Sequence, residues 1–209
     1  LKIADENKFH PVRDYLNALP EWDGIERVNH WMHEALEASG HEEYIRAVAR
    51  KTLTAMVARV YQPGVKFDQV VILEGIQGVG KSTVVRSLAS DAWFSDAKIN
   101  ISDKDGVLSM RAVWIVELGE LGAMRKADVD ELKEFISRRE DRIRVPYGKR
   151  TEMFPRQCIF IGTTNAEDYL RDLTGNRRFW PVKVGECDFD WITENRDQLF
   201  AEAKLCYQL

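Results

Sequence analysis

The sequence has few cysteines and no long apolar run, and each absence excludes a class of protein. Cys158, Cys187 and Cys206 are odd in number and widely spaced, which argues against a disulfide framework or a zinc cluster. No apolar stretch approaches the ~18 residues of a membrane span, and residues 1–10 contain no signal-peptide core. We therefore expect a cytoplasmic protein with no membrane partner.

An excess of positive charge is also lacking, since the formal net charge is −4. A protein that coats nucleic acid relies on a broad positive field, so any DNA contact here must be local. The densest basic segment runs from Arg138 to Arg150 and carries four more positive than negative charges. A solvated surface is the ordinary alternative for such a run.

The composition is that of a folded globular chain, with 44% apolar and 31% charged residues among 209. This length suits one main domain with a helical attachment. The chain opens on Leu1 rather than Met. We therefore expect a fragment of a longer polypeptide whose partner domains lie outside it.

Apolar residues recur at helical intervals through the first 64 residues. The helices expected there end before Pro20, near Gly40 and before Pro63. They span residues 12–19, 25–38 and 42–61. This pattern predicts a helical N-terminal segment over residues 1–64.

The pattern changes after residue 64, where short apolar runs suited to buried strands alternate with helical stretches. The expected strands span residues 70–73, 113–116, 158–161 and 179–184. The expected helices span residues 129–136 and 191–206. This alternation predicts an α/β core over residues 65–209 with a mostly parallel sheet.

Directly after the first expected strand, the segment GIQGVGKS from Gly75 to Ser82 completes the pattern G-x-x-x-x-G-K-[ST]. A strand before it and a helix after it are the context that this phosphate-binding motif requires. The glycines allow a tight turn whose backbone N–H groups point at phosphate oxygens, and the helix N-terminus adds partial positive charge. The motif predicts ATP binding, although kinases, switches and motors all share it.

Two side chains of the motif have expected roles of their own. Lys81 neutralises the β- and γ-phosphates of ATP, and the Ser82 hydroxyl binds Mg²⁺. The residues expected to contact the nucleotide are Gly75, Gln77, Gly78, Val79, Gly80, Lys81, Ser82 and Thr83.

An ATPase also needs a carboxylate near the metal and the attacking water. Glu117 ends the expected strand VWIV and is predicted to bind Mg²⁺ together with Ser82. Glu120 lies three residues on and is the second candidate for the catalytic base. Surface acids on a turn are the alternative for either residue.

Two further polar groups follow expected strands. Asn165 ends the segment GTTN, where its amide would lie beside the γ-phosphate; a simple turn residue is the alternative. Arg177 and Arg178, in GNRRFWP, suit stabilisation of charge on a transferred phosphoryl group. If they lie too far from their own loop, they must complete a neighbour's site; an exposed basic turn is the alternative.

In this order, the motifs GIQGVGKS, WIVELGEL, LKEFISRREDRIRVPYGKR, GTTN and TGNRRFWPV resemble those of the virulence-associated E family. Its members are P-loop ATPases of phages and mobile elements, allied to the superfamily III helicases of the AAA+ class. The resemblance implies a three-layer α/β/α P-loop NTPase core of the AAA+ type. It also implies an arginine finger at Arg178 and self-association into a ring, expected to be a hexamer.

The resemblance further implies that the basic segment is a hairpin that grips single-stranded DNA. DRIRV and TEMF flank PYGKR, whose Gly148 suits a tight turn. Lys149 and Arg150, with Arg144 nearby, would bind phosphates, and Tyr147 would stack on a base. A hairpin packed against another domain is the alternative.

Three functions follow from these features. The favoured one is an ATP-hydrolysing DNA helicase or translocase in the replication of a phage or mobile element. The second is a nucleotide-gated replication initiator or switch that does not unwind DNA. The third is a P-loop kinase, against which the GTTN segment and the arginine pair argue. Relatives carry primase or winged-helix domains, which would lie outside this chain.

Overall fold

A computed structural model describes residues 10–97, 104–119, 126–144, 150–165 and 176–209. Its central sheet has five strands in the order β2-β3-β6-β1-β7, and all four pairings are parallel. The strands are β1 (Val70–Glu74), β2 (Phe94–Ser95), β3 (Ile115–Leu118), β6 (Ile159–Thr164) and β7 (Phe179–Lys183). The predicted α/β fold with a mostly parallel sheet is confirmed.

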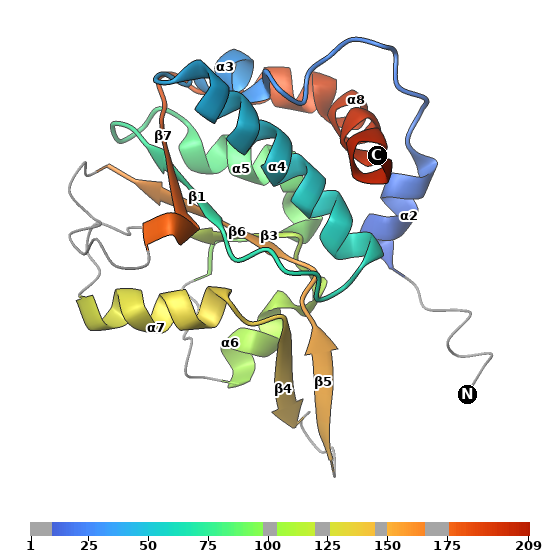
Figure 1. Cartoon of the computed structure of the whole chain (residues 1–209), viewed down its shortest axis with the longest axis vertical. Helices are drawn as coiled ribbons and strands as arrows, with labels where there is room; N and C mark the ends of the chain where they lie inside the picture. Colours follow the sequence, from blue (N-terminus) through green and yellow to red (C-terminus); the bar gives the residue numbers. More distant parts are fainter. Residues whose placement is uncertain (1–9, 98–103, 120–125, 145–149, 166–175) are drawn as a thin grey trace.

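Helices cover both faces of this sheet because successive strand residues point to opposite faces. Val71 and Leu73 of β1 belong to one hydrophobic cluster, whereas Val70 and Ile72 belong to the other. The first cluster is covered by α2 (Pro11–Ala18), α3 (Trp31–Leu36), α4 (Glu42–Tyr61), α5 (Lys81–Ala89) and α8 (Phe189–Gln208) (Figure 1). The second is covered by α6 (Lys104–Ser109) and α7 (Lys126–Ile136). The N-terminal helices therefore share one core with the sheet.

The helix expected over residues 25–38 is shorter in the structure, where α3 begins only at Trp31. Residues 21–28 lie instead across α8, and they include a turn at Gly24 with φ of +83°. The strand expected over residues 113–116 begins two residues later, because Val113 closes a 3-10 turn by donating its N–H to Met110 O. The sequence analysis did not anticipate β2 and α6.

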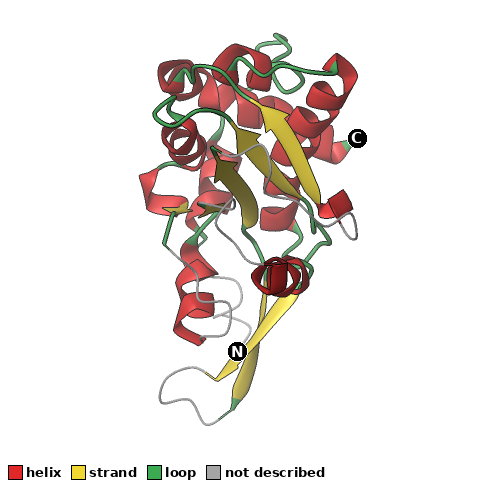
Figure 2. Ribbon diagram, turned by 90° about the vertical axis from the view of Figure 1, so that its left-hand side faces the viewer, coloured by secondary structure: helices red, strands yellow, loops and turns green. Residues whose placement is uncertain are grey.

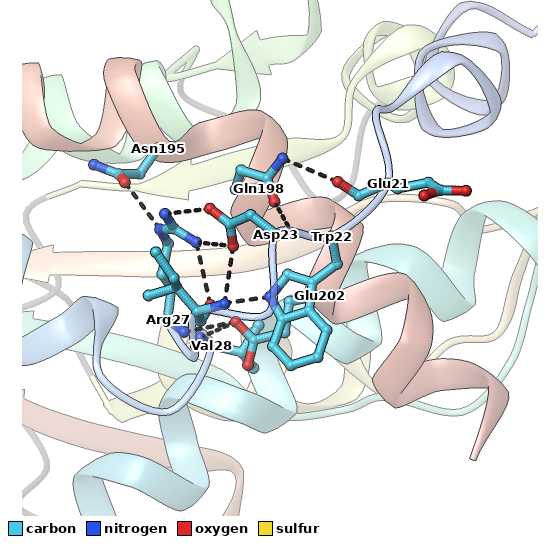
Figure 3. Close-up of polar contacts among 9 residues, drawn as sticks. Glu21, Trp22, Asp23, Arg27, Val28, Asn195, Gln198 and Glu202 are labelled. Carbon is cyan, nitrogen blue, oxygen red and sulfur yellow. Dashed lines mark hydrogen bonds and ion pairs between the residues drawn. The ribbon is translucent and has the colours of Figure 1, made fainter.

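Polar contacts hold residues 21–28, the N-terminal strap, on α8 (Figure 3). The carboxylate of Glu202, which is buried, accepts hydrogen bonds from the backbone N–H groups of Arg27 and Val28 at 2.6 and 2.9 Å. Asp23 accepts from both terminal nitrogens of Arg27, and its own N–H donates to Gln198. The strap is thus tied to α8 by backbone groups as well as by side chains.

A two-stranded antiparallel hairpin projects from the body of the molecule (Figures 1 and 2). It consists of β4 (Glu140–Arg144) and β5 (Thr151–Pro155), the two segments predicted to flank the basic turn. Residues 145–149, which include Tyr147 and Lys149, lie outside the described residues. None of the helices that the structure describes is long and apolar enough to cross a membrane.

Candidate functional site

The loop between β1 and α5 has the glycine-dependent geometry predicted from its sequence. Gly78 and Gly80 have φ angles of +91° and +90°, which side chains of L-residues rarely adopt. A Cβ on Gly75 would lie 2.8 Å from the carbonyl oxygen of Val184. A Cβ on Gly80 would lie 3.3 Å from the Cβ of Cys187. Glycine is therefore needed at three positions, for conformation or for space.

Lys81, the first residue of α5, folds back over this loop. Its Nζ donates to the carbonyl oxygens of Gly75 and Ile76 at 2.7 and 2.8 Å, and to Asn165 Oδ1 at 3.1 Å. The side chain is buried, and this burial lowers the pKa of Lys81, while Cys187 and Glu117 oppose the shift. The structure thus brings together the lysine of the motif and the asparagine at the end of β6.

Glu117 joins the second residue of α5 to the end of β3. Its Oε1 accepts hydrogen bonds from the Ser82 hydroxyl at 2.6 Å and from the Thr163 hydroxyl at 2.7 Å. The side chain is only 5% exposed. Its second oxygen, Oε2, is buried and has no hydrogen-bond partner among the described residues. A buried carboxylate oxygen without a partner is costly, and a bound cation would offset that cost.

The strand order explains why these groups meet. In a parallel sheet the carboxyl ends of all strands lie at one edge, where ligands bind. β6 lies between β1 and β3, so Thr163 and Asn165 come between the loop after β1 and Glu117 on β3. A cavity of about 420 Å³ opens there, lined by Gln77, Gly78, Gly80, Lys81, Ser82, Thr83, Glu117, Gly119, Thr163, Thr164 and Asn165. Gly75 and Val79 line an adjoining cavity of about 770 Å³.

Arg177 and Arg178 lie at the amino ends of the strands, opposite the end that carries the glycine loop. Phe179, the residue after them, pairs with Val70 at the start of β1, whereas the loop follows Glu74 at its end. A five-residue strand separates the two positions by about 16 Å. Arg178 Nε donates to Ser137 Oγ at 3.0 Å and lies 3.6 Å from Asp68 Oδ2, while Arg177 is exposed. Neither arginine reaches the loop of its own chain.

The remaining predicted site residues fall into two groups. Glu120 lies outside the described residues, as do Tyr147 and Lys149. Arg144 and Arg150 are exposed on the hairpin, which projects away from the body (Figure 2). The hairpin is therefore a separate surface and not part of the cavity.

Sequence reasoning missed two contributors to the site. Thr163 of GTTN was not predicted to have a role, although in an extended segment it lies on the same side as Asn165, two residues later. The turn after β7 also packs against the glycine loop, with Cys187 donating its backbone N–H to Val79 O at 2.9 Å. Burial raises the pKa of the Cys187 thiol to about 11, so this thiol is protonated at neutral pH.

The fold and site define an α/β protein with a glycine-rich loop at the carboxyl edge of a parallel sheet. Residues 16–209 match the virulence-associated protein E-like domain, so the chain belongs to this family, as its motifs predicted. No curated protein matches the sequence.

Solved structures of the NrS-1 C-terminal region are similar to this chain. Its apo structure has a TM-score of 0.59 and 16% sequence identity, over 90% of this chain and 47% of that one. Its A form apo structure has a TM-score of 0.57 at the same identity and coverage. This chain therefore spans about half the length of those structures. At this identity the likeness concerns the fold alone.

Proposed function

We propose that this chain is an ATP-hydrolysing subunit of a DNA motor, a helicase or translocase in the replication of a phage or mobile element. The observation that carries the proposal is the contact of Ser82 with Glu117 beside the glycine loop. It joins the hydroxyl of a complete phosphate-loop motif to a buried carboxylate on β3, one strand removed from β1 in the sheet. Membership of the virulence-associated protein E-like family supports the role in replication.

The loop would hold the phosphates of ATP. Its backbone N–H groups and the N-terminus of α5 supply partial positive charge, and Lys81 supplies a full one. In the structure the ammonium of Lys81 donates hydrogen bonds to two loop carbonyls and to Asn165. Phosphate oxygens would replace at least some of these acceptors, so that binding releases the lysine from its own loop.

The residues present also fit Mg²⁺, which prefers oxygen ligands. The Ser82 hydroxyl and the Glu117 carboxylate would hold the ion, and the unpartnered Oε2 of Glu117 would gain a charged neighbour. When bound, Mg²⁺ would offset the charge of the phosphates. Thr163 would orient Glu117 through its hydroxyl, which already donates to Oε1.

Hydrolysis needs a base and a group that positions water. Glu117 is the candidate base that the described residues offer in the cavity, and Glu120 is the other candidate. Asn165 lies next to Lys81 and would hydrogen-bond the γ-phosphate or the attacking water. Arg178 would supply positive charge to the site of a neighbouring subunit, because it lies at the far edge of its own sheet.

The hairpin would grip single-stranded DNA. Arg144 and Arg150 are exposed there, and Lys149 and Tyr147 complete the predicted contact set. Cationic side chains would bind phosphates without regard to sequence, and the tyrosine would stack on a base. Replacing Lys149 and Arg150 together by alanine should weaken binding of an oligonucleotide and reduce its dependence on salt. Unchanged affinity and salt dependence would remove the hairpin from the DNA interface.

The central experiment is ATP turnover as a function of protein concentration, with and without single-stranded DNA. We expect turnover to rise steeply with concentration and with DNA, and to fall at least about a hundredfold in Arg178→Ala. Arg46→Ala, on the exposed surface of α4, is the matched control. Mixing Arg178→Ala with Lys81→Ala should restore part of the activity if sites are shared between subunits.

Other outcomes point elsewhere. Magnesium-dependent ATP binding with slow hydrolysis that DNA does not stimulate would favour a nucleotide-gated switch. An absence of ATP binding would end the proposal. If no mixture of Arg178→Ala and Lys81→Ala recovered turnover under assembling conditions, the shared site would lose its support.

A further inference from the structure

The end of helix α7 holds two arginines that belong to different parts of the molecule. One is Arg156, at the root of the hairpin, and the other is Arg178, before β7. Arg156 Nη1 donates to the carbonyl oxygen of Phe135 at 2.5 Å. Arg178 Nε donates to the hydroxyl of Ser137 at 3.0 Å. Both acceptors lie in or directly after the last turn of the same helix.

The hairpin is fixed firmly to this helix end. Arg156 is 3% exposed and forms a two-point ion pair with the buried Asp141 of β4, with both N–O distances at 2.7 Å. Its guanidinium also lies 4.2 Å from the centre of the Phe135 ring. A buried pair of this kind resists separation, because either partner alone would be an uncompensated charge. Arg156 therefore joins the hairpin root to Phe135 in α7.

The contact with Arg178 differs in character. The guanidinium is held through Nε, and its terminal nitrogens have no hydrogen-bond partner among the described residues. Ser137 is itself fixed, since its hydroxyl donates to Lys133 O at 2.7 Å, one turn back in α7. The guanidinium of Arg178 is thus held at Nε, while Nη1 and Nη2 remain able to contact a phosphate.

We propose that Ser137 is a positioning residue for Arg178, and that the end of α7 couples DNA on the hairpin to hydrolysis at the neighbouring subunit's site. The inference rests on the proposed function, because Arg178 must act on a neighbour's ATP and the hairpin must bind DNA. The helix end is the shared support: a shift of Arg156 moves Phe135, and Ser137 two residues later moves Arg178.

The test compares Ser137→Ala, which removes the acceptor for Arg178, with Ser137→Thr, which keeps a hydroxyl. Ser109→Ala is the matched control, because the Ser109 hydroxyl caps a turn of α6 and is exposed. The readouts are the affinity for a labelled oligonucleotide and the ratio of ATP turnover with DNA to turnover without it. Both are measured at a protein concentration that supports assembly.

We expect Ser137→Ala to lower the stimulation ratio about tenfold, the effect of losing one hydrogen bond to a charged group. Its oligonucleotide affinity should stay within about twofold of the unchanged protein, and Ser137→Thr and Ser109→Ala should keep the ratio. A full ratio in Ser137→Ala would overturn the inference and leave the motor intact. An equal loss in Ser109→Ala would also overturn it, because the effect would then be general.

Amide hydrogen exchange gives a readout without turnover. Oligonucleotide binding should slow exchange at residues 135–139, and it should do so less in Ser137→Ala. Unchanged exchange at these residues, with the oligonucleotide bound, would overturn the coupling. If wild type neither hydrolysed ATP nor bound DNA, the proposed function would fail and the inference with it.

Discussion

The hydroxyl of Ser82 donates a hydrogen bond to Glu117 Oε1 across 2.6 Å, and this contact joins the first turn of α5 to the end of β3. The two residues are 35 positions apart in the chain. Their meeting depends on the parallel strand order, which places both at the same edge of the sheet. The hydroxyl and the carboxylate are the pair that we expect to hold Mg²⁺.

Replacing Glu117 by glutamine should separate ATP binding from hydrolysis. The amide has nearly the same shape and keeps an acceptor for Ser82 and Thr163, but it is a far weaker base. We expect turnover to fall about a hundredfold or more, while ATP affinity changes much less. Glu194→Gln, an exposed change of the same kind on α8, is the control. Undiminished turnover in Glu117→Gln would transfer the role of base to Glu120.

Binding of ATP should take up a proton at alkaline pH. Burial lowers the pKa of Lys81 from its ordinary value of 10.5, whereas nearby phosphates would raise it again. Between the lowered pKa and pH 10.5, Lys81 is partly neutral in the protein without ATP and charged in the protein with ATP bound. The affinity for ATP should therefore fall as pH rises. In the same window the unfolded chain binds more protons, so the stability of the free protein should rise with pH.

Calorimetry in buffers of different ionisation enthalpy measures this proton uptake. Lys66→Met, which removes a lysine whose side chain is 71% exposed, should leave the uptake unchanged. An ATP affinity that stayed constant from neutral pH to pH 10.5 would contradict the assignment to Lys81.

Replacing Gly80 by alanine should destabilise the protein by about 1–2 kcal/mol, the cost of a left-handed conformation for an L-residue. The added Cβ would also lie 3.3 Å from the Cβ of Cys187, so the turn after β7 must shift. Gly119→Ala, where no atom lies within 4 Å of the added Cβ, should cost far less. Urea denaturation of both variants measures the difference, and equal midpoints would refute it.

Replacing Glu202 by alanine should release the N-terminal strap from α8. The carboxylate accepts two backbone N–H groups in a buried setting, and its loss leaves both donors without a partner (Figure 3). We expect a loss of about 2 kcal/mol in unfolding free energy and faster proteolysis within residues 21–28. The exposed Glu194→Ala should show neither effect. A strap as resistant to protease as in wild type would mean that its other contacts with α8 are sufficient to hold it.

Much of the loop was predictable because its determinants are local. Gly78 and Gly80 allow positive φ angles, and Lys81 and Ser82 begin the helix that follows. The four expected strands of the core correspond to β1, β3, β6 and β7 for a similar reason, since each is a short apolar run. Even so, the start of β3 was misplaced by two residues, because Val113 belongs to a turn that tertiary contacts define.

The remaining site features depend on packing between distant segments. The hydroxyl of Thr163 gains its role from the position of Glu117 on the next strand, and no spacing in the sequence encodes that. The same is true of Cys187, which reaches the glycine loop only because β7 is the edge strand beside β1. The sequence does not tell whether Arg178 reaches the glycine loop of its own chain. The register of β1 with β7 shows that it does not.

Because β1 and β7 run parallel, the glycine loop lies at the carboxyl ends of the strands and Arg178 lies at their amino ends. If Arg178 acts on a neighbour's ATP, as proposed, two protomers in head-to-tail contact would match one loop with one arginine and leave one of each without a counterpart. Every further protomer would complete one more site. One loop and one arginine at the two ends of the assembly would remain unpaired until the assembly closed into a ring. Activity per chain would then report closure as well as association.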